Sequence, residues 1–390
     1  MSPTVAVVGA SLAGLSAARA LRNQCYDGRI VVIGDEEHLP YDRPPLSKDF
    51  LAGTASLEDI ALSSPDDADL GLEWRLGTTA VGLDHLSRSV LLRDGSEVEA
   101  DGVVLATGAR ARRLPGGEGL DGVHALRSLD DAIALREDLA AAERLVVIGA
   151  GFIGAEVAST ARKLGLDVTV VETQPVPLAG PLGPDMGAVC AELHADHGTR
   201  LLTGTGVAGL IGTDRVEAVE LTDGTPLPAD VVLVGIGATP NIEWLVDSGV
   251  ALGNGVLTDA RGATNIPGVV AVGDCAATWS TSAERHVRIE HWTNALEQPA
   301  TAVATLLGSA DPAPSPVPYF WSDQYGARIQ FAGSRRETDV ARVVEGSCAD
   351  RSFLVLYERD GEPVAVLGMN QPRLFTRWRR QLRSSVAALS

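Results

Sequence analysis

The sequence predicts an α/β protein in which two similar parallel-sheet units are joined to a smaller α+β unit at the C-terminal end. Its 390 residues are enough for two or three domains. The composition, 45% hydrophobic with 42 glycines, is typical of a folded α/β protein. Two observations carry the prediction: one glycine-rich pattern occurs twice, and the charge of the chain changes sign near residue 317.

The glycine-rich pattern first occurs at the start of the chain. A β-rich run at residues 5–8 (VAVV) leads into a turn at residues 9–14 (GASLAG), and a helical pattern follows to about Arg22. A second apolar run, residues 30–33, is then followed by Gly34 and an acid, Asp35. The order strand, glycine turn, helix, strand, acid defines the Rossmann-like dinucleotide-binding unit.

The second copy keeps the same order. Residues 145–148 (LVVI) lead into residues 149–154 (GAGFIG), a helical pattern to about Leu164, a strand at 168–171 and the acid Glu172. One such turn alone could be an ordinary glycine turn. Two copies with acids at the expected spacing predict two dinucleotide sites.

The glycines have separate physical tasks in such a unit. The first permits a tight turn, the second lets the backbone approach the pyrophosphate, and the third lets helix and strand pack closely. The phosphates then lie at the helix N-terminus, where free N–H groups favour negative charge. The first copy departs from the pattern because Ser11 replaces the second glycine. The binding residues predicted from the two turns are Gly9, Ser11 and Gly14, and Gly149, Gly151, Ile153 and Gly154.

Glu172 indicates which nicotinamide cofactor is used. A carboxylate at this position suits the free 2′-hydroxyl of NADH and repels the 2′-phosphate of NADPH. Residues 173–176 (TQPV) offer no arginine for that phosphate. The alternative is that Glu172 only caps the end of a strand. We expect NADH to be preferred.

Three further strand ends are candidate ligand contacts. Residues 103–109 (VVLATGA) and 231–241 (VVLVGIGATPN) are apolar strands that run into small-residue turns, where the backbone can lie close to a ligand. The residues predicted to do so are Ala106, Thr107, Gly108, Gly235 and Gly237. Asp274 is expected to end another strand, at the sheet edge where ligands bind. It could accept hydrogen bonds from a ribityl chain, or it could belong to an ordinary turn.

Charge and cysteine content exclude several other classes. The net charge of −19 and a pI of about 4.7 disfavour binding to nucleic acid. Four scattered cysteines without a C-x-x-C pair indicate neither a metal site nor a redox dithiol, and they fit a reducing cytoplasm. We see no membrane-spanning run and expect a cytoplasmic protein.

Four segments carry a resemblance to a known family: residues 40–48 (PYDRPPLSK), 126–132 (LRSLDDA), 288–298 (RIEHWTNALEQ) and 320–325 (FWSDQY). The chain resembles the FAD-dependent pyridine nucleotide-disulfide oxidoreductases. Within that superfamily it is similar to the ferredoxin reductases that serve bacterial Rieske dioxygenases and cytochrome monooxygenases. The disulfide reductases of the superfamily carry a cysteine pair in the region of residues 40–48, where this chain has none.

The resemblance implies how the chain is divided. The NAD-binding domain, residues 115–240, would be inserted into an FAD-binding domain formed by residues 1–114 and 241–316. Residues 317–390 would form the α+β C-terminal domain. The cofactors would be FAD and NADH, with no metal.

The resemblance also assigns individual residues. Lys48 would lie beside the flavin ring and pair with Glu156, because a cation there stabilises the reduced, anionic flavin. The alternative for Glu156 is a solvated acid on a helix face. Trp321 would lie close to the flavin, or it could be a packed core residue. The FAD contacts implied by the family are Ala13, Asp35, Arg43, Lys48, Val81, Arg127, Asp274 and Trp292.

The C-terminal part has the opposite charge to the rest. Residues 321–390 contain 11 arginines, no lysine and eight acids, a net charge of +3, against −22 for residues 1–320. Its basic stretch consists of Arg373, Arg377, Arg379, Arg380 and Arg383. This stretch could be a solvated helix face or could attract an acidic protein. The resemblance favours docking of a small acidic 2Fe–2S ferredoxin.

These expectations define one function and its alternatives. The chain is expected to be an NADH-dependent ferredoxin reductase, acting as a monomer or weak dimer. A rubredoxin reductase or an NADH oxidase is the alternative within enzymes. A flavin-binding signalling protein similar to apoptosis-inducing factor is the alternative outside them.

Overall fold

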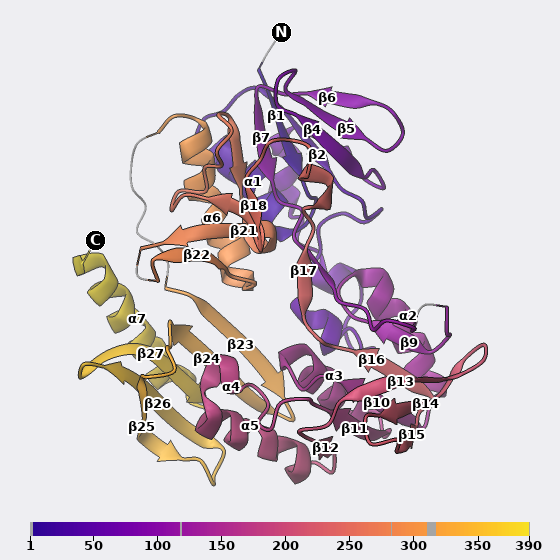
Figure 1. Ribbon diagram of the computed structural model, residues 1–390. Coiled ribbons are helices and arrows are strands. Elements are labelled where there is room, and N and C mark those ends of the chain that lie inside the picture. Colours follow the sequence, from indigo (N-terminus) through magenta and orange to yellow (C-terminus); the bar gives the residue numbers. More distant parts are fainter. Residues whose placement is uncertain (1–2, 118, 282, 310–316, 390) are drawn as a thin grey trace.

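The computed structural model describes residues 3–117, 119–281, 283–309 and 317–389. Figure 1 shows an upper body made of the indigo and orange segments, a lower body made of the magenta segments, and a yellow sheet beside the lower body. The upper body therefore combines two distant stretches of the chain, and the lower body is formed by the residues between them.

The upper body is built on a parallel sheet with the order β20-β7-β1-β2-β3. Its strands are short apolar runs, as expected for a parallel sheet that is covered on both faces. Helices α1 (Leu12–Asn23) and α6 (Trp292–Leu306) pack against each other on this sheet. The strands are β1 (Thr4–Val8), β2 (Arg29–Ile33), β3 (Leu72–Arg75), β7 (Gly102–Leu105) and β20 (Val269–Ala271).

The lower body repeats this arrangement with the order β9-β16-β10-β11-β12. All five strands occupy the places of strands in the upper sheet, in the order given, which confirms the duplication inferred from the glycine turns. The helix after the second turn is α3 (Phe152–Lys163). The strands are β9 (Val123–Ala125), β10 (Arg144–Ile148), β11 (Asp167–Val171), β12 (Arg200–Leu202) and β16 (Val231–Val234).

Smaller elements complete the two bodies. Strands β8 (Ala109–Ala111) and β17 (Ala238–Pro240) pair in antiparallel fashion where the chain passes between the bodies. One antiparallel sheet contains β4 (Ala80–Asp84), β5 (Ser89–Leu92) and β6 (Glu97–Glu99). Another contains β13 (Val207–Gly212), β14 (Val216–Leu221) and β15 (Pro226–Pro228). A mixed sheet of the upper body contains β18 (Leu252–Gly253), β19 (Gly255–Thr258), β21 (Ala276–Ser280) and β22 (Arg285–Arg288). The other helices here are α2 (Leu129–Ala141), α4 (Ala179–Leu182) and α5 (Pro184–Asp196), with 3₁₀ turns at Pro44–Ser47, Glu58–Ile60, Pro65–Leu70, Glu243–Leu245 and Gly273–Cys275.

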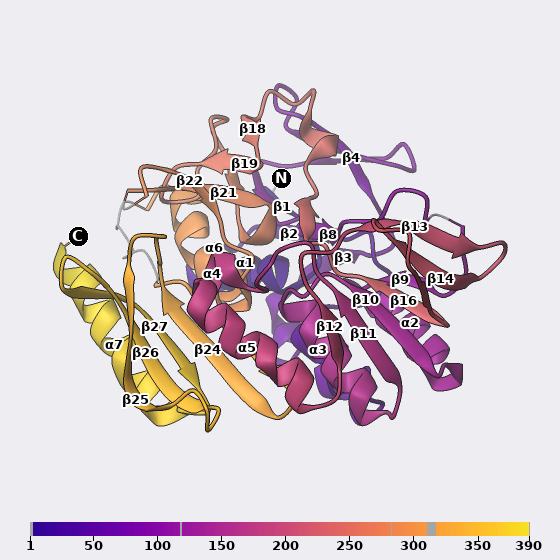
Figure 2. The same ribbon diagram turned by 60° about the horizontal axis from the view of Figure 1, so that its bottom comes forward.

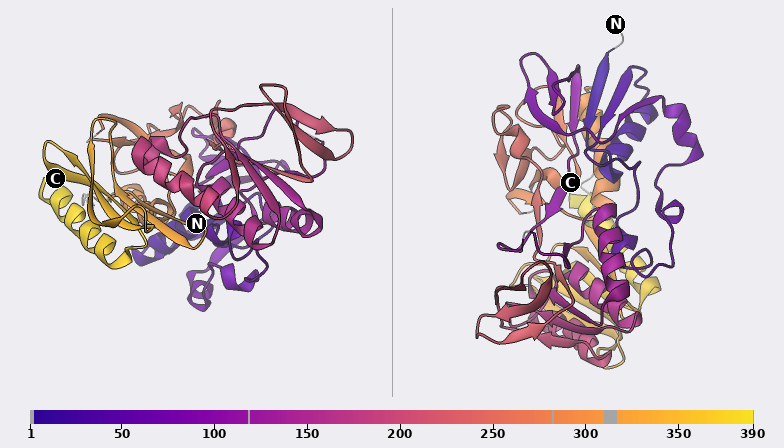
Figure 3. Two further views of the ribbon diagram at one scale, coloured as in Figure 1. Left: turned by 90° about the horizontal axis from the view of Figure 1, so that it is seen from below. Right: turned by 90° about the vertical axis from the view of Figure 1, so that its right-hand side faces the viewer.

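The C-terminal part is an antiparallel sheet covered by one helix, α7 (Pro372–Leu389). Buried residues of this sheet, such as Phe353 and Tyr357, belong to the same core as Leu145 and Val168 of the lower parallel sheet. Figure 2 shows α5 between the two sheets, and Figure 3 shows the same neighbours from below. The strands are β23 (Tyr319–Gln324), β24 (Ala327–Gly333), β25 (Val340–Ser347), β26 (Ser352–Arg359) and β27 (Glu362–Met369).

The strand ends differ between the two copies. Val8 pairs with Ile33 as Ile148 pairs with Val171, so Gly34 takes the place of Glu172 and Asp35 lies one residue further along. The expectation that Asp274 ends a strand is wrong. β20 stops at Ala271, and Asp274 lies in the 3₁₀ turn Gly273–Cys275 that follows.

No helix in the described part of the chain is long and apolar enough to cross a membrane.

The two glycine turns allow a direct test of which glycines are required by packing. A Cβ atom on Gly154 would lie 2.1 Å from the carbonyl oxygen of Gly149, whereas one on Gly151 would have no atom within 4 Å. We expect Gly154→Ala to lower the free energy of unfolding by about 1–3 kcal/mol because the helix must move away from the turn. Gly151→Ala is the control and should unfold like the unaltered chain in urea. Equal stability of both variants would contradict this packing argument.

Candidate functional site

The N-termini of α1 and α3 are open in a way that favours phosphate binding. Neither helix has a side chain hydrogen-bonded to its first turn, and neither has an acid there. By contrast, α2 is closed by a capping box in which Ser128 and Asp131 bond to each other's backbone N–H groups. The free N–H groups of α1 and α3 therefore remain available to an anionic ligand.

A cavity of about 310 Å³ lies in front of α3. Five of the seven residues predicted to bind NAD line it: Gly149, Gly151, Glu172, Gly235 and Gly237. Gly154 instead packs behind the turn, and Ile153 is 45% exposed at the start of the helix. The open space at Gly151 and the uncapped helix fit a dinucleotide pyrophosphate, so these residues could hold NADH.

Glu172 holds the strand end and also lines the cavity. One carboxylate oxygen accepts from the N–H of Ala150 at 2.9 Å, and the other accepts from the N–H of Gln174 at 2.8 Å. These bonds fix the carboxylate at the cavity edge. The oxygen bonded to Gln174 also accepts from the hydroxyl of Thr173 at 3.2 Å. The oxygen bonded to Ala150 keeps a second lone pair, so the strand-capping role and the ligand-binding role are compatible.

The first glycine turn is held closely to the strand ends around it. A Cβ atom on Gly9 would lie 2.0 Å from the carbonyl oxygen of Ala106, and one on Gly14 would lie 1.8 Å from that of Gly9. The hydroxyl of Ser11 accepts a bond from Arg43 Nε at 3.3 Å. The structure thus brings together five residues that were predicted to contact one ligand: Gly9, Ser11, Gly14, Arg43 and Ala106.

Arg43 has an acidic partner that the sequence did not identify. Its guanidinium forms an ion pair with Glu36 at 2.6 Å, whereas Asp35 is exposed. The signal was present in the sequence as three consecutive acids, residues 35–37, but all three lie beyond the end of β2, so the pattern does not show which one reaches Arg43. The proposed ribose role of Asp35 stays a prediction.

Asp274 lies in a charged cluster at the end of the upper sheet. Its carboxylate forms an ion pair with Arg127, whose Nε donates to the carbonyl of Ala109 at 2.9 Å. Ala13 contacts the same turn, because a Cβ atom on Gly273 would be 2.9 Å from that of Ala13. Thr107 and Gly108, also predicted, are held by hydrogen bonds to Asn241.

Two buried polar atoms near this cluster have no hydrogen-bond partner among the described residues. They are Nε of Arg288, whose guanidinium also bonds to the carbonyl of Asp274, and Nδ1 of His291. Burial lowers the pKa of His291 to about 4, which keeps its ring neutral. Because such orphaned atoms are costly, they fit a site built for a polar ligand. Together with the open N-terminus of α1, they fit FAD.

Lys48 and Glu156 form the ion pair expected from the sequence. Lys48 Nζ lies 2.6 Å from the Glu156 carboxylate, and the Glu156 side chain is only 3% exposed. The same carboxylate accepts from the hydroxyls of Ser47 and Ser322, both at 2.6 Å. Glu156 is therefore not a solvated acid on a helix face. Sequence reasoning missed both serines, although they lie inside the PPLSK and WSDQ segments.

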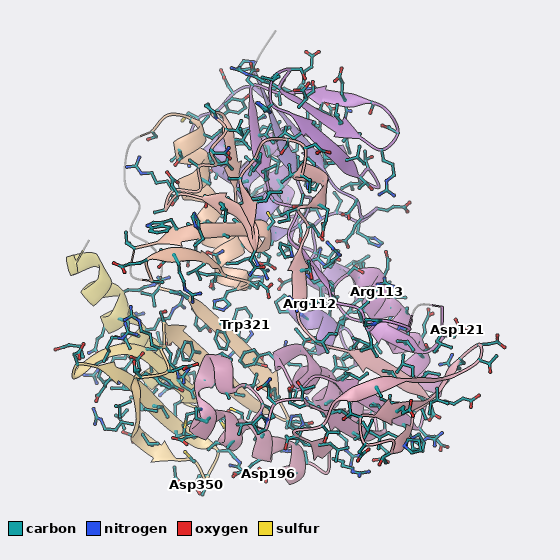
Figure 4. All side chains as sticks on the ribbon, viewed as in Figure 1. Arg112, Arg113, Asp121, Asp196, Trp321 and Asp350 are labelled. Atoms are coloured by element: carbon teal, nitrogen blue, oxygen red, sulfur yellow. The ribbon has the colours of Figure 1, made fainter. Side chains whose placement is uncertain are left out.

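Trp321 belongs to an aromatic group and also packs against the core of the C-terminal sheet, so its place near the flavin stays a prediction. Its indole is edge-on to Trp292, with ring centroids 5.8 Å apart, and it stacks on Tyr319. Trp292 Nε1 donates to Asp42 at 2.6 Å, and burial raises the pKa of that carboxyl. Figure 4 places Trp321 near the centre of the molecule, between the upper and lower bodies.

Two remaining residues bear on the flavin prediction. Val81 lies on β4 and is 45% exposed, so its contact with FAD stays a prediction.

Cys275, next to Asp274, is fully buried, and its thiol donates to the carbonyl of Val272 at 3.3 Å. Burial raises the thiol pKa. This cysteine therefore has the properties of a structural residue rather than a redox nucleophile.

The chain is similar to known proteins along almost its whole length. Residues 3–299 match the family model described as pyridine nucleotide-disulphide oxidoreductase, and residues 319–389 match one described as reductase C-terminal. The ferredoxin reductase component of a chlorobenzene dioxygenase from a Cupriavidus species is 40% identical, covering 96% of this chain and 91% of that protein. Putidaredoxin reductase of Pseudomonas putida is 39% identical over 94% and 89%.

Solved structures agree with these relatives. The covalent complex of putidaredoxin reductase with putidaredoxin contains a chain with a TM-score of 0.92 and 38% identity, covering 98% of this chain and 93% of that chain. The likeness extends over all three parts of the fold.

The buried ion pair can be tested by a double-mutant cycle. Glu156→Leu removes the partner of a largely buried ammonium group, so we expect it to lower the free energy of unfolding by about 3–5 kcal/mol. Adding Lys48→Met removes the unpaired charge and should restore part of this loss. Urea titrations of the four proteins measure the coupling. Additive effects of the two substitutions would contradict a direct interaction.

Proposed function

We propose that this chain, which belongs to the pyridine nucleotide-disulphide oxidoreductase family, is an NADH-dependent ferredoxin reductase. In the reaction, one NADH and two oxidised ferredoxins give NAD⁺, one proton and two reduced ferredoxins. The terminal acceptor would be a cytochrome monooxygenase or a Rieske dioxygenase; one relative is named as a component of a chlorobenzene dioxygenase. The observation that carries the proposal is the cluster around Glu156. It joins α3, whose N-terminus faces the proposed NADH cavity, to Lys48 and to β23, the strand that carries Trp321.

The chain's own residues have distinct tasks in this reaction. When bound, FAD supplies chemistry that nicotinamide lacks, because it accepts a hydride and releases two electrons singly. Gly151 and the N-terminus of α3 would bind the NADH phosphates, and Glu172 would bind the ribose hydroxyls. Arg43, Arg127 and Asp274 would hold FAD.

Lys48 would contribute a positive charge beside the bound flavin. Its position is fixed by Glu156 and by the carbonyl of Pro44, to which it donates at 3.0 Å. Ser47 and Ser322 in turn fix the Glu156 carboxylate. A cation held in this way requires no rearrangement when negative charge develops near it.

The partner would be a small acidic 2Fe–2S ferredoxin that binds transiently, and the reductase would be a monomer or weak dimer. The basic stretch on α7 supports this, but fewer of its arginines are free than the sequence suggests. Arg383 pairs with Glu297 of α6, and Arg379 lies over the ring of Tyr319. Arg373 and Arg377 are exposed and remain the best candidates for docking charges.

The function can be tested with purified, FAD-loaded protein. NADH-driven reduction of cytochrome c should be fast when a 2Fe–2S ferredoxin is present and slow without it, because the carrier accepts the single electrons. A ferredoxin heated to destroy its cluster is the control. Equal rates with and without the carrier would identify an oxidase or a dye reductase, and a preference for rubredoxin would identify the other alternative.

The choice of cofactor can be tested at Glu172. Glu172→Gln keeps an oxygen for one of the two N–H groups, those of Ala150 and Gln174, and removes the charge that repels a 2′-phosphate. We expect the ratio of kcat/KM for NADH to that for NADPH to fall by about 10-fold, equivalent to about 1.4 kcal/mol. Gln174→Ala is the control, since only its backbone bonds to Glu172. An unchanged ratio would show that Glu172 only holds the strand end.

A further inference from the structure

Three aromatic side chains connect the Lys48 region with the C-terminal helix. Trp292 at the start of α6 is edge-on to Trp321 of β23, and Trp321 stacks on Tyr319 with centroids 5.9 Å apart and planes at 24°. Offset and edge-on contacts of this kind are the favoured geometries of aromatic pairs. The three rings therefore form a continuous group, which we call the aromatic row.

A charged side chain holds each end of the aromatic row. At one end, Asp42 accepts the indole N–H of Trp292 at 2.6 Å. At the other end, the guanidinium of Arg379 lies 3.9 Å from the centroid of Tyr319. Tyr319 is held further by Gln330, which donates to its hydroxyl at 3.0 Å.

Arg379 differs from the other arginines of α7. Its Nε is buried and has no hydrogen-bond partner in the described part of the chain, and burial lowers its pKa. A guanidinium can tolerate this environment because it is planar and weakly hydrated and stacks well on an aromatic face. Arg377, two residues earlier on the same helix, is exposed. The two arginines have the same charge but different surroundings.

We propose that Arg379 is a positioning residue that fixes Trp321 through Tyr319, and that it is not a docking charge. This inference rests on the proposed function, in which single electrons leave near Trp321. Fixed orientation matters there because a displacement of about 1 Å can change a rate about 100-fold. Each electron lost by the reduced cofactor is gained by one 2Fe–2S cluster, so two ferredoxins are served per NADH.

The test compares Arg379→Met with Arg377→Met. Both remove one charge from α7, and methionine can fill the space of the arginine stem. Arg379→Met should slow electron transfer to saturating ferredoxin about 10-fold in stopped-flow measurements, with KM changed less than twofold. Arg377→Met should act mainly on KM and reduce its dependence on salt concentration. Arg379→Lys should restore part of the rate, because the cation remains but its planar stacking is lost.

A second variant covers the case in which Arg379→Met does not fold. Tyr319→Leu removes the ring between Arg379 and Trp321 and should slow saturated electron transfer to a similar extent. In the double variant the two effects should not add, because both act through the same contact. Additive effects would overturn the proposal.

The outcomes separate this inference from the proposed function. If Arg379→Met changes KM and salt dependence as Arg377→Met does, Arg379 is a docking charge and the inference fails. If the unaltered protein does not reduce ferredoxin, the proposed function fails. In that case near-ultraviolet circular dichroism still tests positioning, because Arg379→Met should weaken the signal of the coupled indoles that Trp321→Leu abolishes.

Discussion

The arrangement of this molecule depends on one buried carboxylate. Glu156 on α3 of the lower body binds Lys48 and Ser47 of the upper body and Ser322 of the C-terminal sheet. A carboxylate that is only 3% exposed is tolerated only when its oxygens are satisfied, and here three donors do so. Because Glu156 belongs to the lower body and its donors come from the upper body and the C-terminal sheet, satisfying this carboxylate also sets where the three parts meet.

The C-terminal sheet is more than an appended module. Its buried residues share one core with the lower parallel sheet, and the hydroxyl of Tyr325 contacts His194 of α5 at 2.9 Å. Burial in this contact lowers the pKa of His194 to about 4. A change of composition near residue 317 therefore marks a boundary in sequence, whereas the packing continues across it. This shared core fixes β23, and with it Trp321, relative to α3.

Features set by local sequence could be predicted, whereas those set by where a strand ends could not. The glycine turns and the helices after them were expected from motifs and spacing, and the Lys48–Glu156 pair was expected from the family resemblance. The pairing of Arg43 with Glu36 was not, because Glu36 lies beyond the end of β2 and the path of the chain there decides which acid reaches Arg43. Likewise, the 3₁₀ turn that holds Asp274 depends on where β20 stops, and apolar runs do not reveal this to within a residue or two.

The charge of α7 shows why counting residues of one sign overstates a docking surface. Five arginines without an intervening acid suggest a uniform patch, but the fold uses Arg379 to cover Tyr319 and Arg383 to bind Glu297. Arg379 lies against the aromatic row, and the exposed side chain of Arg383 reaches Glu297 of α6. The helix is therefore held to the body of the protein by the same residue type that would attract an acidic partner. Long-range attraction depends on the whole helix, while the fit of a partner depends on the few charges that remain exposed.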